Sequence, residues 1–171
     1  MTTFSLLVPS LAAVIVLLAC SAFFSSSESA VFSLPEEWLR TVADDSVDAR
    51  TLSELRSDPH RLLVTILVGN NLINIAITSI VTLLVAEFAP PGATVVFATL
   101  ATSVIILVFG EIVPKSYGLG HAEAWSLRVA RPLTYVERVL APVVTVFDAV
   151  TRWLTRLLGG DQGIEEPYLD D

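Results

Sequence analysis

Apolar residues occur in three long runs that are separated by short polar segments. The runs cover about residues 4–33, 60–87 and 92–113. Each run has at least the roughly 20 residues that an α-helix needs to cross about 30 Å of hydrocarbon. The pattern therefore predicts an all-α integral membrane protein with three transmembrane helices.

The polar segments between the runs carry helix-start and turn signals. Ser33 followed by Pro35 is typical of a helix start, with Ser33 as the N-cap. Breaks at 44–46 and at 58–59 divide residues 35–58 into two short surface helices. The stretch 89–92, Ala-Pro-Pro-Gly, predicts a tight turn, so we expect the second and third runs to form a helical hairpin.

Beyond the third run, apolar and basic residues are interleaved over about 120–158, which is typical of juxtamembrane amphipathic helices at a membrane interface. Residues 139–151 are too few to form a fourth span, and they include Pro142 and Asp148. We expect a transmembrane domain over 1–158 and an acidic linker over 159–171.

The distribution of charge predicts the topology. The chain is 53% hydrophobic and 16% charged, a composition that excludes an ordinary soluble domain, and nothing in it points to a nucleic-acid partner. The ten basic residues all lie within 40–61 and 115–156. The positive-inside rule places both blocks in the cytoplasm, with the N-terminus outside and the C-terminus inside. We expect a multi-pass protein of the plasma (cytoplasmic) membrane, in contact with the lipid bilayer.

The first run has two simpler interpretations, a signal peptide and a lipoprotein cleavage box at Val16 to Cys20. Neither fits well, because no Lys or Arg precedes the run and its apolar character continues to Phe32. Cys20 is the single cysteine, which excludes an intramolecular disulfide and a cysteine-based metal site.

Polar side chains inside the apolar runs are the candidate functional residues. Ser21, Ser25 and Glu28 share one face of the first helix, and Asn70 and Asn74 share one face of the second. Serines in membrane helices often bond their own backbone, and asparagines often bond between helices. An ionisable residue such as Glu28 is costly in hydrocarbon and is therefore a functional candidate.

The third run ends on Phe-Gly-Glu-Ile-Val-Pro-Lys, residues 109–115. Pro114 has no N–H, so the carbonyl of Gly110 loses its α-helical partner. We expect the helix to break here. The bared Gly110 carbonyl and the Glu111 carboxylate would then form a pair of hard oxygens of the kind that membrane proteins use to bind cations.

The three motifs fall in the same half of the membrane and can converge. Hydroxyl, amide, carbonyl and carboxylate oxygens favour Mg²⁺, Ca²⁺ or Na⁺ over Zn²⁺ or copper, and six of them suit the octahedron of Mg²⁺. Glu28 is a candidate second charge or Na⁺ site. Lys115 is either a flanking charge or a partner for Glu28 or Glu111 when no cation is bound. The candidate ligands are Ser21, Ser25, Asn70, Asn74, Gly110 and Glu111.

Together the motifs at 21–30, 69–74 and 109–115 resemble the transmembrane domain of the CNNM/CorC family, the cyclin M and CorC group of magnesium transporters. The resemblance implies a homodimer that exports Mg²⁺ with a Na⁺ gradient as the driving force. It assigns the same six residues to the ion. It also implies an ATP-binding CBS-pair module in the full-length protein, which this chain lacks.

We therefore expect a Mg²⁺ transporter that works by alternating access. A non-transporting membrane Mg²⁺ sensor or scaffold is the alternative, since it also requires Mg²⁺ binding. No Ser-His or Asp-Asp pairing suited to catalysis is present, so we do not expect an enzyme.

Overall fold

The structure, a computed structural model, describes residues 2–43, 46–90 and 92–157. These residues form helices joined by short turns, and no strand occurs among them. Three segments are long and apolar enough to cross a membrane: Leu7–Phe32, Pro59–Ala86 and Thr94–Gly120. The predicted all-α membrane fold with three spans is confirmed.

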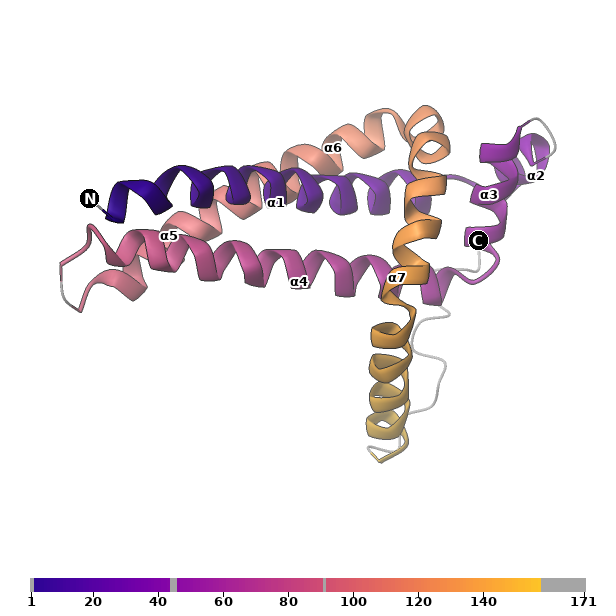
Figure 1. Ribbon diagram of the computed structural model, residues 1–171. Coiled ribbons are helices and arrows are strands. Elements are labelled where there is room, and N and C mark those ends of the chain that lie inside the picture. The colour runs from indigo at the N-terminus through magenta and orange to yellow at the C-terminus, as the bar shows by residue number, and fades with distance from the viewer. Residues whose placement is uncertain (1, 44–45, 91, 158–171) are drawn as a thin grey trace.

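The spans lie side by side in a small bundle (Figure 1). Helices α1 (Thr2–Phe32) and α4 (Pro59–Ala86) each form one span. The third span consists of α5 (Thr94–Ile105), the π-helix η1 (Ile106–Ile112) and α6 (Val113–Gly120). This span packs against α4 at its start and against α1 further on, so α1 contacts both other spans.

The predicted helical hairpin of the second and third spans is confirmed. The N–H of Ala93 donates to the carbonyl of Pro90 over 3.1 Å, which closes the turn between α4 and α5. Gly92 in this turn has a φ of 87°, a conformation that only glycine adopts without strain. The turn and the start of α1 lie at the same end of the bundle (Figure 1).

The opposite end carries α2 (Glu36–Val42) and α3 (Val47–Arg56), the two short helices that the sequence predicts. We call it the basic end. The prediction that Ser33 caps α2 is wrong. The Ser33 hydroxyl donates to the carbonyl of Ala30 over 3.1 Å, so it completes the last turn of α1. Pro35 precedes α2 without a side-chain cap.

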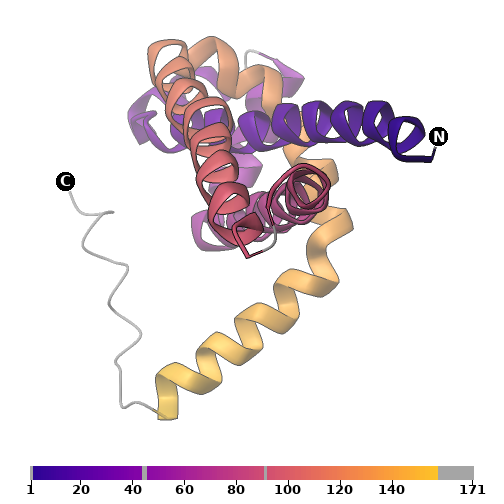
Figure 2. The ribbon, with the colours of Figure 1, turned by 90° about the vertical axis from the view of Figure 1, so that its left-hand side faces the viewer.

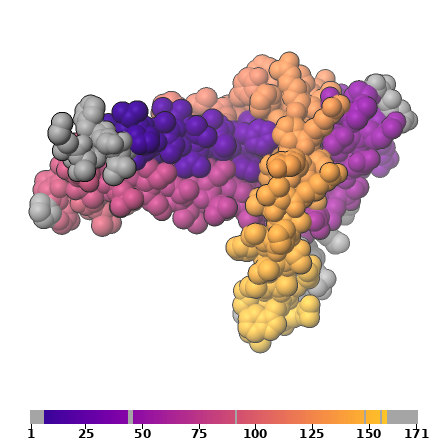
Figure 3. All heavy atoms as spheres, in the orientation of Figure 1, coloured from indigo at the N-terminus to yellow at the C-terminus, as the bar shows by residue number. Residues whose placement is uncertain are grey.

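Helix α7 (Ala122–Leu157) crosses the bundle at the basic end, and its second half extends away from the spans (Figures 1 and 2). The space-filling view shows this half as a separate arm (Figure 3). The sequence predicts several helices here, whereas the structure has one. Pro132 and Pro142 lie inside it with exposed side chains, so water or lipid headgroups can satisfy the carbonyls that each proline leaves unpaired. The expected linker at 159–171 lies outside the described residues.

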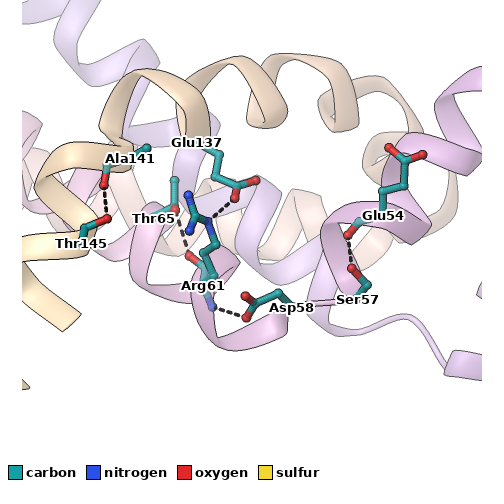
Figure 4. A network of polar contacts seen from close by, with 8 residues as sticks. All are labelled: Glu54, Ser57, Asp58, Arg61, Thr65, Glu137, Ala141 and Thr145. Atoms are coloured by element: carbon teal, nitrogen blue, oxygen red, sulfur yellow. Dashed lines mark hydrogen bonds and ion pairs between the residues drawn. The ribbon is translucent and has the colours of Figure 1, made fainter. Parts of the chain in front are cut away.

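Polar contacts fix the helices at the basic end (Figure 4). Asp58 caps α4 by accepting from the N–H of Arg61, and the Arg61 side chain pairs with Glu137 of α7. Arg56 of α3 donates to the carbonyl of Val31 over 2.8 Å, at the C-terminal end of α1. Burial lowers the pKa of Arg56, and the nearby Glu36 carboxylate opposes that shift. The guanidinium nevertheless stays charged and stabilises the end of α1.

Two apolar clusters fill the interior. The larger one lies at the basic end and joins α1, α2, α3, α4 and α7 around Leu52 and Leu62. The smaller one joins α1 to α4 around Val14 and Ile77, with Ile106 of η1 packed against it. Along α1, the segment from Ser21 to Ser27 follows the smaller cluster and overlaps the start of the larger one at Phe24, and most of the buried polar side chains gather there.

Candidate metal centre

Ser21 of α1 is fully buried and faces two asparagines of α4. Its hydroxyl oxygen lies 3.0 Å from Oδ1 of Asn70 and 3.0 Å from Oδ1 of Asn74. The two asparagines are one turn apart, which brings both amide oxygens to the same side chain. The first two sequence motifs therefore converge as predicted. Asn71 points away and donates to the carbonyl of Leu67.

Gly110 of the third motif lies directly against this group. A Cβ atom built on Gly110 would stand 2.8 Å from the Ser21 hydroxyl, closer than a real Cβ contact. Any larger residue would push the serine away from the asparagines. We call Ser21, Asn70, Asn74 and Gly110 the oxygen cluster. It takes one residue from α1, two from α4 and one from η1.

Glycines also allow α1 to pack closely against α4 and α6 on the basic-end side of the oxygen cluster. Gly69 of α4 lies under the ring of Phe24, where an added Cβ would stand 2.6 Å from Cζ. Gly118 of α6 touches the backbone carbonyl of Ser26, where a Cβ would come within 2.2 Å of the oxygen. Small residues at helix contacts are typical of membrane bundles, because they let the backbones approach.

The expectation that Pro114 breaks the third helix is wrong. The chain instead widens into η1, where the N–H of Val113 donates to the carbonyl of Val108, five residues earlier. Pro114 follows in the first turn of α6, where its missing N–H costs little. The π-helix removes the clash that a proline makes in an α-helix. Pro114 still cannot donate to the carbonyl of Gly110.

The two acidic candidates differ in their surroundings. Glu111 follows Gly110 in η1 and is half-buried. Glu28, the candidate second charge, pairs with Lys115 of α6 over 3.3 Å. The suggested pairing of Lys115 with Glu28 is thus present in the structure.

Three buried hydroxyls have no hydrogen-bond partner among the described residues: Ser25, Ser27 and Thr102. Other hydroxyls in the spans, such as Thr65 and Thr78, donate to the carbonyl four residues earlier. Ser25 lies one turn from Ser21 on the same face of α1 and is fully buried. Its hydroxyl therefore remains free to contact an ion bound at the oxygen cluster. Thr102 of α5 was not predicted, because a single threonine in an apolar run carries no signal.

Sequence reasoning also missed the contact that locks α7 onto α1. The indole N–H of Trp125 donates to the Ser26 hydroxyl over 3.0 Å, and Ser26 donates in turn to the carbonyl of Phe23. Tyr117 of α6 packs edge-on against Trp125, with ring centroids 5.4 Å apart. Ser26 thus has a packing role, as its spacing in a membrane helix suggests.

The oxygens that meet in this centre are neutral, and Glu111 follows Gly110 in the chain. Among the described residues, no group of three or more His, Cys, Asp or Glu side chains lies close enough to hold a metal ion. The described oxygens that meet here are those of a hydroxyl and two amides. Such oxygen sets suit hard cations.

Three membrane-crossing helices and a buried cluster of polar oxygens define a multi-pass membrane protein with a candidate cation site between its spans. Comparison with known proteins gives the family. Residues 12–171 match the family described as "Cyclin M transmembrane N-terminal domain", and the chain belongs to it.

Relatives of the chain occur in plants and bacteria. A chloroplastic DUF21 domain-containing protein of Arabidopsis thaliana is 35% identical over 91% of the chain, which spans 24% of that protein. A UPF0053 protein of Haemophilus influenzae is 33% identical over 85% of the chain and 34% of its own length. The UPF0053 inner membrane protein YfjD of Escherichia coli is 31% identical over 81% of the chain and 32% of its own length. The chain therefore spans about a quarter to a third of these relatives.

Proposed function

We propose that this domain carries Mg²⁺ across the membrane, outward and in exchange for Na⁺. Membership of the cyclin M family supports a role related to metal-ion transport in a membrane. The choice of ion, the direction and the coupling are inferences from the residues and from the family resemblance. The plasma membrane is the proposed location.

The observation that carries the proposal is the spacing of the oxygen cluster. Ser21 lies 3.0 Å from the amide oxygens of both Asn70 and Asn74. Neighbouring ligands of a regular octahedron with bonds of about 2.0–2.1 Å are about 2.9 Å apart. The separations of the Ser21 oxygen from each amide oxygen match that spacing, whereas Ca²⁺ or Na⁺, with longer bonds, would need wider separations.

The remaining ligands complete a hard-oxygen site. The Gly110 carbonyl has no α-helical donor at Pro114, Ser25 has a free buried hydroxyl, and Glu111 supplies the negative charge. Water molecules would occupy the positions that the protein leaves open, since Mg²⁺ gives up its hydration reluctantly.

The surroundings of the oxygen cluster favour access from the basic end. Toward the opposite end the apolar cluster of Val14, Ile77 and Ile106 fills the interior. Toward the basic end the larger apolar cluster begins at Phe24, but the partly exposed side chains of Glu28 and Lys115 also lie on that side. With that end in the cytoplasm, this arrangement suits the inward-facing state of an alternating-access exporter. Na⁺ would compete for the same or neighbouring oxygens.

The proposal includes partners outside this chain. Large apolar side chains are exposed along the spans, for example Ile75, Leu83 and Phe109, and they face lipid or a second subunit of the proposed homodimer. An ATP-binding CBS-pair module is proposed for the full-length protein, because the chain covers only part of its relatives.

Flux measurements test the proposal directly. The chain would be reconstituted in proteoliposomes, and Mg²⁺ flux would be followed with and without an opposing Na⁺ gradient. We expect Na⁺-dependent Mg²⁺ flux that Glu111→Gln abolishes, because the amide keeps the shape of the side chain but loses its charge. Glu123→Gln, at an exposed position on α7, is the matched control and should transport normally.

Other outcomes separate the alternatives. Mg²⁺ binding without flux in either protein would contradict transport by this chain and favour the Mg²⁺ sensor. Equal protection from heating by Ca²⁺ and Mg²⁺ would contradict the octahedral argument. Unchanged flux in Glu111→Gln would place the ion elsewhere.

A further inference from the structure

The ion pair between Glu28 and Lys115 joins α1 to α6 beside the oxygen cluster. The Lys115 ammonium lies 3.3 Å from the Glu28 carboxylate. The two side chains are 25% (Glu28) and 41% (Lys115) exposed, so neither is sealed in the interior. An ion pair with this much exposure stabilises a fold only weakly. Its position is therefore more informative than its contribution to stability.

Both partners lie about one helical turn from the candidate ligands. Glu28 is three residues beyond Ser25 on the same face of α1, on the side of the basic end. Lys115 follows Glu111 by four residues along the third span, the spacing at which a glutamate and a lysine of one helix can pair. Lys115 thus pairs with Glu28 and follows Glu111 by one turn along the third span.

The identity of this basic residue is unusual for the chain. Lys115 is the single lysine, and the other nine basic residues are arginines. An arginine binds a carboxylate through two parallel hydrogen bonds, whereas a lysine is a single flexible charge that is more easily displaced. Arg61 and Arg131, by contrast, form ion pairs that join α7 to α4 and to α3.

Charge balance at this place depends on the lysine. With Lys115 present and no metal, Glu28, Glu111 and Lys115 sum to one negative charge. Adding Mg²⁺ gives one positive charge, which is unfavourable in a membrane interior. If the ammonium moves away toward the basic end, Mg²⁺ and the two carboxylates sum to zero.

We propose that Lys115 is a tethered cation that neutralises Glu28 when no metal is bound, and that Mg²⁺ displaces it. Glu28, about two turns from Ser21 along α1, then contributes its charge to the bound ion at a distance or through water. Lys115 and Mg²⁺ therefore compete, and the lysine sets the Mg²⁺ concentration at which the site fills. This inference rests on the proposed function and deepens it, because it adds a positioning residue and a second carboxylate to the same site.

The single lysine allows a direct test on the purified chain. An amine-reactive reagent modifies Lys115 and the N-terminal amine, and mass spectrometry of peptides separates the two. We expect Mg²⁺ to increase the modification rate of Lys115, because the displaced ammonium becomes free. In Glu111→Gln the rate should not respond to Mg²⁺. A lysine that only holds α1 against α6 would react at the same rate with and without Mg²⁺.

Substitutions give an independent measurement. Protection from thermal unfolding would be titrated with Mg²⁺ at constant ionic strength for wild type, Lys115→Met, Lys115→Arg and Glu28→Gln. We expect Lys115→Met to lower the half-saturating Mg²⁺ concentration by at least about threefold, because a repelling charge is lost. Lys115→Arg should raise it, and so should Glu28→Gln. In the Glu28→Gln background, Lys115→Met should lower the half-saturating Mg²⁺ concentration by a smaller factor than it does in the wild type.

The outcomes separate this inference from the proposed function. If wild type responds to Mg²⁺ but neither Lys115 reactivity nor the Lys115→Met midpoint changes, the pair is structural and the inference is wrong, while the Mg²⁺ site stands. If wild type itself shows no response to Mg²⁺, the proposed function fails and the inference fails with it. If Lys115→Met does not fold, the wild-type modification rate still decides.

Discussion

The Ser21 hydroxyl lies within hydrogen-bonding distance of two acceptors. It has one hydrogen to donate, yet two amide oxygens lie 3.0 Å away. One of those oxygens therefore receives no hydrogen from Ser21 unless its amide turns over to offer N–H instead. Buried oxygens that face one another without hydrogens repel, and a cation between them removes that repulsion. The geometry of this one residue supports the proposal that a cation binds between α1 and α4.

The close contact between Ser21 and Gly110 leads to the first residue-scale prediction. In Gly110→Ala the new Cβ would stand 2.8 Å from the Ser21 hydroxyl, which must then rotate away from the asparagines. Because one ligand is lost, we expect the half-saturating Mg²⁺ concentration in a thermal protection assay to rise about tenfold. The free energy of unfolding without Mg²⁺ should fall by about 1–3 kcal/mol from overpacking.

Gly120→Ala is the matched control, since no atom lies within 4 Å of a Cβ at that position. It should leave both the Mg²⁺ midpoint and the unfolding temperature unchanged. A normal Mg²⁺ midpoint in Gly110→Ala would show that Ser21 is not a ligand.

At the scale of elements, the third span determines the position of Gly110. Glycine, glutamate and proline within 109–115 indicate a candidate cation site, but the sequence does not reveal a π-helix. Apart from Gly110, the residues of Ile106–Ile112 are common in membrane helices, and we attribute the wider turn to fitting Pro114 into a helix that must also pack on α1. The same limitation applies to Ser33, whose role depends on where α1 ends. Local pattern predicts where helices lie, and packing between helices decides how they end or widen.

The contact between α1 and α6 gives an element-scale prediction. In Gly118→Ala the Cβ would lie 2.2 Å from the backbone oxygen of Ser26, and neither backbone can move unless the helices separate. We expect a loss of about 3 kcal/mol or more in the free energy of unfolding, or failure to fold. A thermal scan in detergent would measure the loss, with Gly120→Ala of the same helix as the reference. Equal stability of the two variants would mean that α6 does not pack on α1 as described.

For the whole molecule, the sequence predicts the number of spans and the partners in the oxygen cluster. Hydropathy and length suffice for the spans, because every backbone group in lipid must bond within a helix. The convergence of Ser21 with Asn70 and Asn74 is predictable from the sequence. In a regular helix, the position of a residue determines both the face on which it lies and its depth in the membrane. The continuity of α7 through Pro132 and Pro142 is not predictable in this way, because it depends on the surroundings of the freed carbonyls.

Topology is the whole-molecule property on which the direction of transport depends. The basic residues at 40–61 and 115–156 predict that the basic end faces the cytoplasm. Since Cys20 is the single cysteine, Cys20→Ser gives a background for labelling. In that background, Phe88→Cys, in the exposed turn after α4, should react with a membrane-impermeant maleimide in intact cells. Ser57→Cys, exposed at the end of α3, should react only after permeabilisation.

The reverse labelling pattern would invert the mechanism. The polar residues Glu28 and Lys115 would then lead from the oxygen cluster to the outside, and the apolar cluster around Ile77 would close the cytoplasmic side. The same oxygens would then load Mg²⁺ from outside, and the described state would suit uptake instead of export. The labelling result thus decides which side of the membrane the basic end faces, independently of whether Mg²⁺ binds.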